Sequence, residues 1–124
     1  MFTKHFTPQE ANRRLPLIKG IVSDILGKGK RARTILASFT GDEPPDEVSE
    51  LQDEMEALMT ELEQLGCFYK DWNFEIGLVD FPSILDSREV LLCWRSDEPI
   101  VRWYHGMEDG YAGRKLIPEN LLDS

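Results

Sequence analysis

The sequence lacks long apolar runs and has few cysteines, which excludes membrane-spanning and disulfide-stabilised classes of protein. A helix that spans a bilayer needs about 20 apolar residues, and no run in the 124 residues approaches that length. The opening segment, MFTKHFTPQEANRRLPL, has no apolar signal-peptide core. The two cysteines, Cys67 and Cys93, also lack a metal-finger spacing, so we interpret them as small apolar core residues of a cytoplasmic protein.

Positive charge and histidine are scarce as well. The chain has 14 lysines and arginines against 23 aspartates and glutamates, a net charge of -9. Such a chain repels phosphate backbones and anionic headgroups, so nucleic acid and membranes are not expected partners. The only histidines, His5 and His105, lie outside the predicted helices, which excludes the Glu-x-x-His pairs of a ferritin-type di-iron site. Gly27 and Gly29 fall inside a helical pattern, so they do not form a phosphate loop.

The first half of the chain has the pattern of a helical hairpin. Thr7 can cap a helix, Pro8 suits its first position, and Glu10 completes a capping box. Apolar or small residues then recur at alternating spacings of four and three over residues 11–39, and again over a second helix at 46–65. The linker TGDEPPDE separates the two stripes, so the helices are expected to fold back antiparallel.

The unequal lengths of these helices favour a homodimer. The first helix is about 45 Å long and the second about 30 Å, so the first turns of the longer helix must pack on something else. A second copy would cover them by completing a four-helix bundle, and the small Gly29 and Ala32 would let its helix approach closely. Packing on the chain's own sheet is the alternative. The predicted dimer interface consists of Leu15, Ile18, Val22 and Ile25.

The second half of the chain predicts a small antiparallel β-meander. The segments CFYKD, GLVDFP, EVLLCWR and IVRWYH are short, β-branched or aromatic, and separated by turn residues. If Arg95 pairs with Ile100 across the turn at 96–99, one apolar face collects Val90, Leu92, Trp94, Val101, Trp103 and His105. The fold class is therefore α+β in a single domain 1–124, with a hairpin at 7–65, a meander at 67–105, and a loop and tail at 106–124.

Asp80 is the unexpected residue of this meander, because it lies between Val79 and Phe81 in a strand. The plain interpretation is that Asp80 points to the mixed face and pairs with Arg95 or Arg102 across strands. The alternative is a metal site at one rim of the sheet, where Asp80 and His105 end their strands. Further carboxylates reach that rim: Glu89, Glu108 and Asp109.

Histidine with carboxylates suits Zn²⁺, Mn²⁺ or Fe²⁺. The predicted register weakens this idea, because it places His105 on the face opposite to Asp80. The same register disfavours a Cys93–His105 nucleophile pair. The other end of the sheet collects Asp71, Arg95, Asp97 and Glu98, and the simplest interpretation is that these charged residues form a solvated surface. The segment GYAGR at 110–114 could bind an anion through backbone N–H groups and Arg114, although a plain turn explains it as well.

The segments KDWNFEIGLVDFP, LCWRSDEPIVRWYH and GYAGRKLI, with the opening FTPQEANRRLPLI, resemble a family of small bacterial proteins, number 2203 of the domains of unknown function. The resemblance implies a ferritin-like helical arrangement, which agrees with a dimeric bundle, and it implies no activity. The sequence departs from the family pattern at Asp97, where a glycine is expected, and in the order of Trp103 and Tyr104. The pattern draws attention to Lys70, Asp71, Asp80, Trp94, Glu98, His105, Gly110 and Arg114.

Two functions follow as hypotheses. The first is a homodimeric interaction or scaffold protein whose partner the sequence does not name, with Asp80 in a structural ion pair. The second is a small metal- or ligand-binding protein, which includes a metal-dependent enzyme. Its metal candidates are Asp80, Glu98 and His105, and its ligand-binding candidates are Lys70, Asp71, Arg102 and Arg114.

Overall fold

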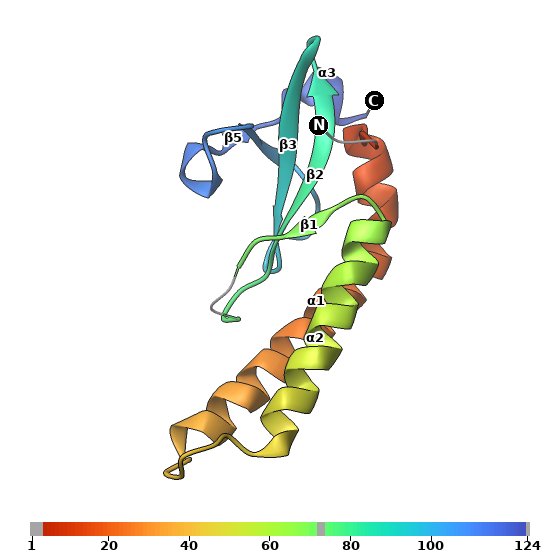
Figure 1. Ribbon diagram of the computed structural model, residues 1–124. Helices are drawn as coiled ribbons and strands as arrows, with labels where there is room; N and C mark the ends of the chain where they lie inside the picture. Colours follow the sequence, from red (N-terminus) through yellow and green to blue (C-terminus); the bar gives the residue numbers. More distant parts are fainter. Residues whose placement is uncertain (1–3, 72–73, 124) are drawn as a thin grey trace.

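The computed structural model describes residues 4–71 and 74–123 and has an α+β architecture, as predicted (Figure 1). A long helical hairpin is followed by a five-stranded antiparallel sheet with strand order β1-β2-β3-β4-β5. None of the described helices is apolar enough over a sufficient length to cross a membrane. The elements are α1 (Pro8–Ala37), α2 (Asp46–Gln64), β1 (Phe68–Tyr69), β2 (Leu78–Leu85), β3 (Arg88–Arg95), β4 (Trp103–Gly106), the 3₁₀ turn η1 (Tyr111–Gly113), β5 (Lys115–Leu116) and α3 (Glu119–Leu122).

The start of α1 is fixed by the capping box that its sequence predicts. The Thr7 hydroxyl accepts the backbone N–H of Glu10 at 3.1 Å, and the Glu10 carboxylate accepts the N–H of Thr7 at 2.9 Å. These bonds satisfy two N–H groups that have no partner inside the helix. From this start α1 continues for 30 residues, which confirms the long first helix.

The sheet of the same chain covers the first part of the apolar stripe of α1. Leu15, Ile18, Val22 and Ile25 are at most 3% exposed and belong to one core cluster with Val79, Phe81, Val90, Leu92 and Trp94 of β2 and β3. Figure 1 shows the sheet against the first half of α1, while the far half of the hairpin extends beyond it. The chain's own sheet thus occupies the place given to the predicted dimer interface. The dimeric four-helix bundle itself stays a prediction.

The small residue Gly29 has a different neighbour from the one expected. A Cβ atom at this position would lie 2.5 Å from the ring of Phe74, which comes from the loop before β2. The close approach at Gly29 therefore admits an aromatic side chain of the same chain, not a partner helix.

The predicted register of β4 is wrong by one residue. Val90 lies opposite Gly106 and Leu91 opposite His105, whereas the sequence interpretation placed Leu91 opposite Tyr104. The loop before β4 is longer than a tight hairpin, and within it Asn12 of α1 binds the backbone of Val101. Its amide oxygen accepts the Val101 N–H at 2.7 Å, and its amide nitrogen donates to the Val101 carbonyl at 2.9 Å. A shift of one residue moves every side chain of β4 to the other face of the sheet.

Candidate functional site

Three side chains with metal-binding chemistry meet on the face of the sheet that points away from the helices. Asp80 of β2 lies opposite Cys93 of β3, and the corrected register brings His105 of β4 to the same face. All three are buried, with exposed fractions of 4%, 1% and 4%. The expectation that His105 faces away from Asp80 and Cys93 is therefore wrong.

A pocket of about 350 Å³ connects this cluster to the surface. Its inner end is formed by Asp80, Cys93 and His105. The segment after β4 contributes Met107, Glu108, Gly110 and Tyr111 to its lining, and the remaining walls come from Lys70, Leu78 and Leu91. The three buried polar residues thus belong to the lining of a pocket, which a plain structural ion pair does not require.

The hydrogen bonds of His105 leave one lone pair directed at Asp80. Its Nδ1 lies 2.8 Å from the carbonyl oxygen of Gly106, and because a carbonyl only accepts, Nδ1 must carry the hydrogen. In the neutral ring Nε2 is then an acceptor, and it lies 3.3 Å from Oδ1 of Asp80. Two acceptors that face each other need a proton or a cation between them.

Burial shifts the pKa values of two groups in this cluster. It raises the pKa of the Asp80 carboxyl, and the interactions of Asp80 with His105 and Lys70 oppose this shift without overcoming it. Burial, reinforced by the Asp80 charge, raises the pKa of the Cys93 thiol to about 12, against the opposing charge of Arg114. Groups with such perturbed protonation in a pocket are candidates for function.

The spacing of the cluster suits a single metal ion. Two ligand atoms that each lie about 2.0 Å from a tetrahedral zinc ion are about 3.3 Å apart, which is the observed Nε2–Oδ1 distance. A charge-assisted histidine–carboxylate hydrogen bond is normally shorter, about 2.7–2.9 Å. The three donor atoms lie within 4.8 Å of one another, so a shift of about 1 Å would close the set on one ion.

Glu98 lies outside this cluster. Its Oε1 accepts a hydrogen bond at 2.7 Å from the Arg114 guanidinium and another at 2.7 Å from the backbone N–H of Arg95. The Arg114 guanidinium also donates to the Cys93 carbonyl at 3.1 Å and lies over the rings of Trp103 and Tyr111. Glu98 and Arg114 therefore form a supporting layer beside the cluster.

The remaining predicted residues are dispersed. Asp80 contacts His105 and not the predicted Arg95 or Arg102. Arg95 instead donates to Asp97 and to the Tyr111 hydroxyl, both at 2.6 Å. Lys70 lines the pocket, the exposed Arg102 does not, and the Asp71 carboxylate accepts the N–H of Ile76 at 3.2 Å.

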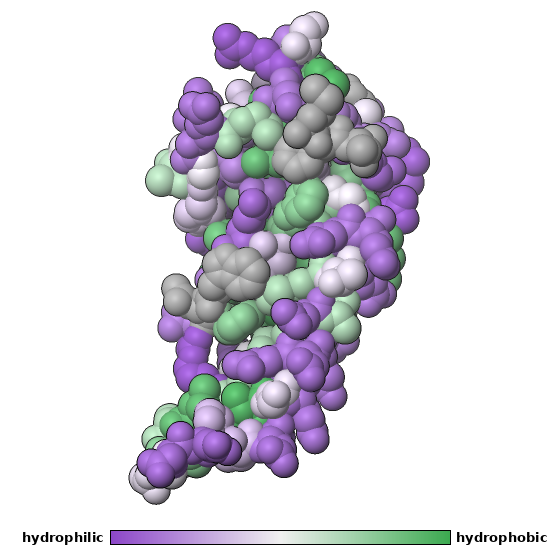
Figure 2. All heavy atoms as spheres, viewed as in Figure 1, coloured by the Kyte–Doolittle hydropathy of each residue, from purple (hydrophilic) through white to green (hydrophobic). Residues whose placement is uncertain are grey.

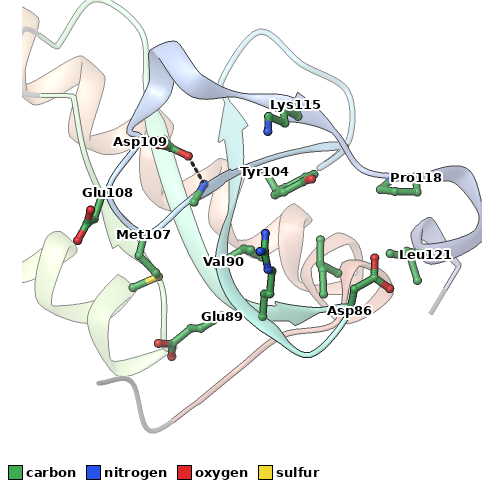
Figure 3. A pocket seen from close by; sticks show the side chains of 13 residues that line it. Asp86, Glu89, Val90, Tyr104, Met107, Glu108, Asp109, Lys115, Pro118 and Leu121 are labelled. Atoms are coloured by element: carbon green, nitrogen blue, oxygen red, sulfur yellow. Dashed lines mark hydrogen bonds between the residues drawn. The ribbon is translucent and has the colours of Figure 1, made fainter.

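The other carboxylates of the predicted rim border a second, larger pocket of about 800 Å³. Figure 3 shows Asp86 and Glu89 near the tip of the β2–β3 hairpin, Asp109 in the turn after β4, and Leu121 on α3. Glu89 is paired with His5 at 2.7 Å, and Asp109 accepts the Gly106 N–H at 3.3 Å. Asp80, Cys93 and His105 do not line this pocket, and its charged side chains are exposed. The smaller pocket therefore carries the more specific chemistry.

Cys93 is the member of the cluster that sequence reasoning missed. The register of β2 against β3 would have identified Cys93 as a neighbour of Asp80. Asp86 and Ser87 form the turn between these strands, so Leu85 lies opposite Arg88. That pairing places Cys93 opposite Asp80.

Comparison with known proteins adds family membership and no activity. The sequence model of a family described as "Uncharacterized conserved protein (DUF2203)" matches residues 4–117. Neither the curated proteins nor the solved structures include a match to the chain.

Proposed function

The chain belongs to the DUF2203 family of uncharacterized conserved proteins, and we propose that it binds one divalent metal ion on Asp80, Cys93 and His105. Zn²⁺ is the preferred ion, because a set of one thiolate, one imidazole and one carboxylate combines the ligand types that zinc takes. Mn²⁺ and Fe²⁺, which the sequence also suggested, suit a soft thiolate less well.

The observation that carries the proposal is the buried group of Asp80, Cys93 and His105, whose donor atoms lie within 4.8 Å of one another and include Nε2 and Oδ1 at 3.3 Å. The bond from Nδ1 to the Gly106 carbonyl supports it, because metal-binding histidines usually donate their other N–H to such a carbonyl. Three protein ligands leave the fourth position of a tetrahedral ion for water or a ligand from the pocket. An ion there would supply Lewis-acid chemistry toward a small molecule.

The test is metal analysis of untagged protein purified without chelators. We expect about one zinc ion per chain after loading and dialysis. Cys93→Ser should lose most of the bound metal, whereas Cys67→Ser should keep it, because Cys67 is equally buried but bonds to the Leu62 carbonyl. Circular dichroism would establish that both variants fold. Equal metal content in the two variants would contradict the proposal.

A second observation favours self-association through the far half of the hairpin. Helix α1 carries seven basic and two acidic side chains, whereas α2 carries eight acidic and no basic ones. In Figure 2 hydrophilic side chains dominate the hairpin, with hydrophobic ones near its free end, where Leu36 is 43% exposed. We propose that two hairpins pair with the α1 of each chain against the α2 of the other, which would complete a four-helix bundle away from the sheet.

Charge reversal tests this pairing. Glu50→Lys with Asp53→Lys lowers the negative charge of α2 from -8 to -4, and Lys30→Glu with Arg33→Glu lowers the positive charge of α1 from +5 to +1. Each double variant alone should be a monomer in light scattering, and an equimolar mixture should form a heterodimer. A monomeric wild-type protein, or variants that dimerise as well as it does, would remove this proposal without touching the metal site.

A further inference from the structure

The pocket beside the cluster has the features of a site for a small organic anion. We propose that it binds a short-chain monocarboxylate, whose carboxylate takes the open position of the metal ion while Lys70 and Tyr111 hold its charge. This inference rests on the proposed metal site. It goes beyond that site by naming the chemical class of the ligand and the residues that select it.

The mouth of the pocket offers more hydrogen-bond donors than acceptors. Lys70 follows β1 directly, and its backbone N–H is fixed by a 2.8 Å bond to the Leu78 carbonyl. The Tyr111 hydroxyl oxygen already accepts a hydrogen bond from Arg95 at 2.6 Å. Its own hydrogen is then left to donate, and Tyr111 lines the pocket. Among the described lining residues, Glu108 is an exposed acidic side chain after β4 and Asp80 is a buried one.

The charge of the inner end also admits an anion. The Asp80 carboxylate and the Cys93 thiolate would balance a divalent ion, and His105 would bind it as a neutral ring. A bound metal ion would thus balance the charges of its two anionic ligands and leave the inner end neutral toward a carboxylate. Lys70 lines the same pocket as the three proposed ligands, so its positive charge favours an anion in that space.

The walls distinguish a monocarboxylate from phosphate. Leu78, Leu91 and Met107 contribute apolar side chains to the lining of the pocket. They favour an alkyl chain and offer nothing to the additional oxygens of a phosphate dianion, which a single lysine would not neutralise. A volume of about 350 Å³ is at the small end of ligand pockets, which suits a molecule of a few carbon atoms.

The absorption spectrum of cobalt-loaded protein reports both metal binding and binding of the carboxylate. A sulfur-to-cobalt charge-transfer band reports that Co²⁺ is bound through Cys93, and the d–d bands report a change in its fourth ligand. The probes are acetate, butyrate and inorganic phosphate, each titrated at constant pH and ionic strength. Butyrate should shift the d–d bands in a saturable way, more tightly than acetate, and phosphate should not compete at equal concentration.

Lys70→Gln should weaken butyrate binding about tenfold and leave cobalt affinity unchanged. Lys115→Gln, an exposed lysine of the larger pocket, is the matched control and should bind butyrate like wild type. A charge-transfer band without any response to butyrate overturns the inference alone. Equal butyrate affinity in the two variants, or phosphate binding as tight as butyrate, overturns it too. Absence of the charge-transfer band overturns the metal site and this inference with it.

Discussion

His105 reaches across β3 to Asp80, and the two side chains meet with 3.3 Å between Nε2 and Oδ1 in a buried environment. This contact depends on the register of β4, in which His105 lies opposite Leu91, and Asn12 holds Val101 just before that strand. The sequence motif that drew attention to Asp80 is thus explained by a cluster of polar groups, not by a surface ion pair with an arginine.

Asp80→Asn should stabilise the ion-free protein at neutral pH by on the order of 1 kcal/mol. Burial raises the pKa of Asp80, so the folded state is disfavoured wherever the carboxyl is ionised, and an amide removes that penalty. Urea denaturation of metal-free protein measures the effect. Glu89→Gln is the control, since its carboxylate is partly exposed and paired only with His5, and it should change stability little.

The gain from Asp80→Asn should disappear in acid. Below the ordinary pKa of 3.8, Asp80 is protonated in both the folded and the unfolded chain, so it contributes no difference between them. As pH rises from there toward the raised pKa of the folded state, the unfolded chain ionises first and wild-type stability falls relative to the variant. A variant that is less stable than wild type at pH 7, or equally stabilised at pH 3, would contradict this account.

Metal binding should release protons, because the Cys93 thiol has a pKa of about 12 and only a thiolate binds the ion. We expect about one proton or more per ion at pH 7, and a metal affinity that rises about tenfold per pH unit for each proton released. Calorimetric titrations of Zn²⁺ in buffers of different ionisation enthalpy count these protons. Tight binding without proton release would show that Cys93 is not a ligand.

Arg114→Lys should lower the free energy of unfolding by roughly 2 kcal/mol. The guanidinium, 9% exposed in its side chain, binds Glu98 and the Cys93 carbonyl and packs on two aromatic rings. Lysine cannot make these contacts together, because its ammonium lacks the planar fork. Chemical denaturation measures the loss, and Arg102→Lys at an exposed position should change stability by less than about 0.5 kcal/mol.

Glu98→Gln separates this supporting layer from the metal site. The variant weakens the contact with Arg114 and should lower stability while the metal content stays at the wild-type level, since Glu98 lies outside the cluster of Asp80, Cys93 and His105. Loss of metal from a folded Glu98→Gln protein would restore Glu98 as a ligand, as the sequence first suggested.

The parts of the fold that depend on local signals were predictable from the sequence. Thr7 and Glu10 mark the start of α1 by contacts three residues apart, and the apolar spacing gives the lengths of both helices. The pairing of β2 with β3 was equally accessible. Asp86 and Ser87 both adopt positive φ in a two-residue turn, and such turns join strands that pair directly across them.

The composition of the site was not predictable by the same means. The face of the sheet on which His105 lies depends on how many residues between β3 and β4 are not paired with the neighbouring strand. We attribute that number to the contact between Asn12 and Val101, 89 positions apart in the chain. Hydrophobic alternation could not reveal it, because Trp103, Tyr104 and His105 are compatible with either face.

Asn12→Ala tests that explanation directly. The substitution leaves the N–H and C=O of Val101 without their partner at a site that is partly buried, which should lower stability by about 1–3 kcal/mol. It should also loosen the register of β4, and so reduce zinc affinity, although Asn12 contacts none of the proposed ligands. Asn120→Ala on the exposed side of α3 is the control. If Asn12→Ala loses stability but binds zinc like wild type, then the rest of the sheet is sufficient to hold His105 beside Asp80.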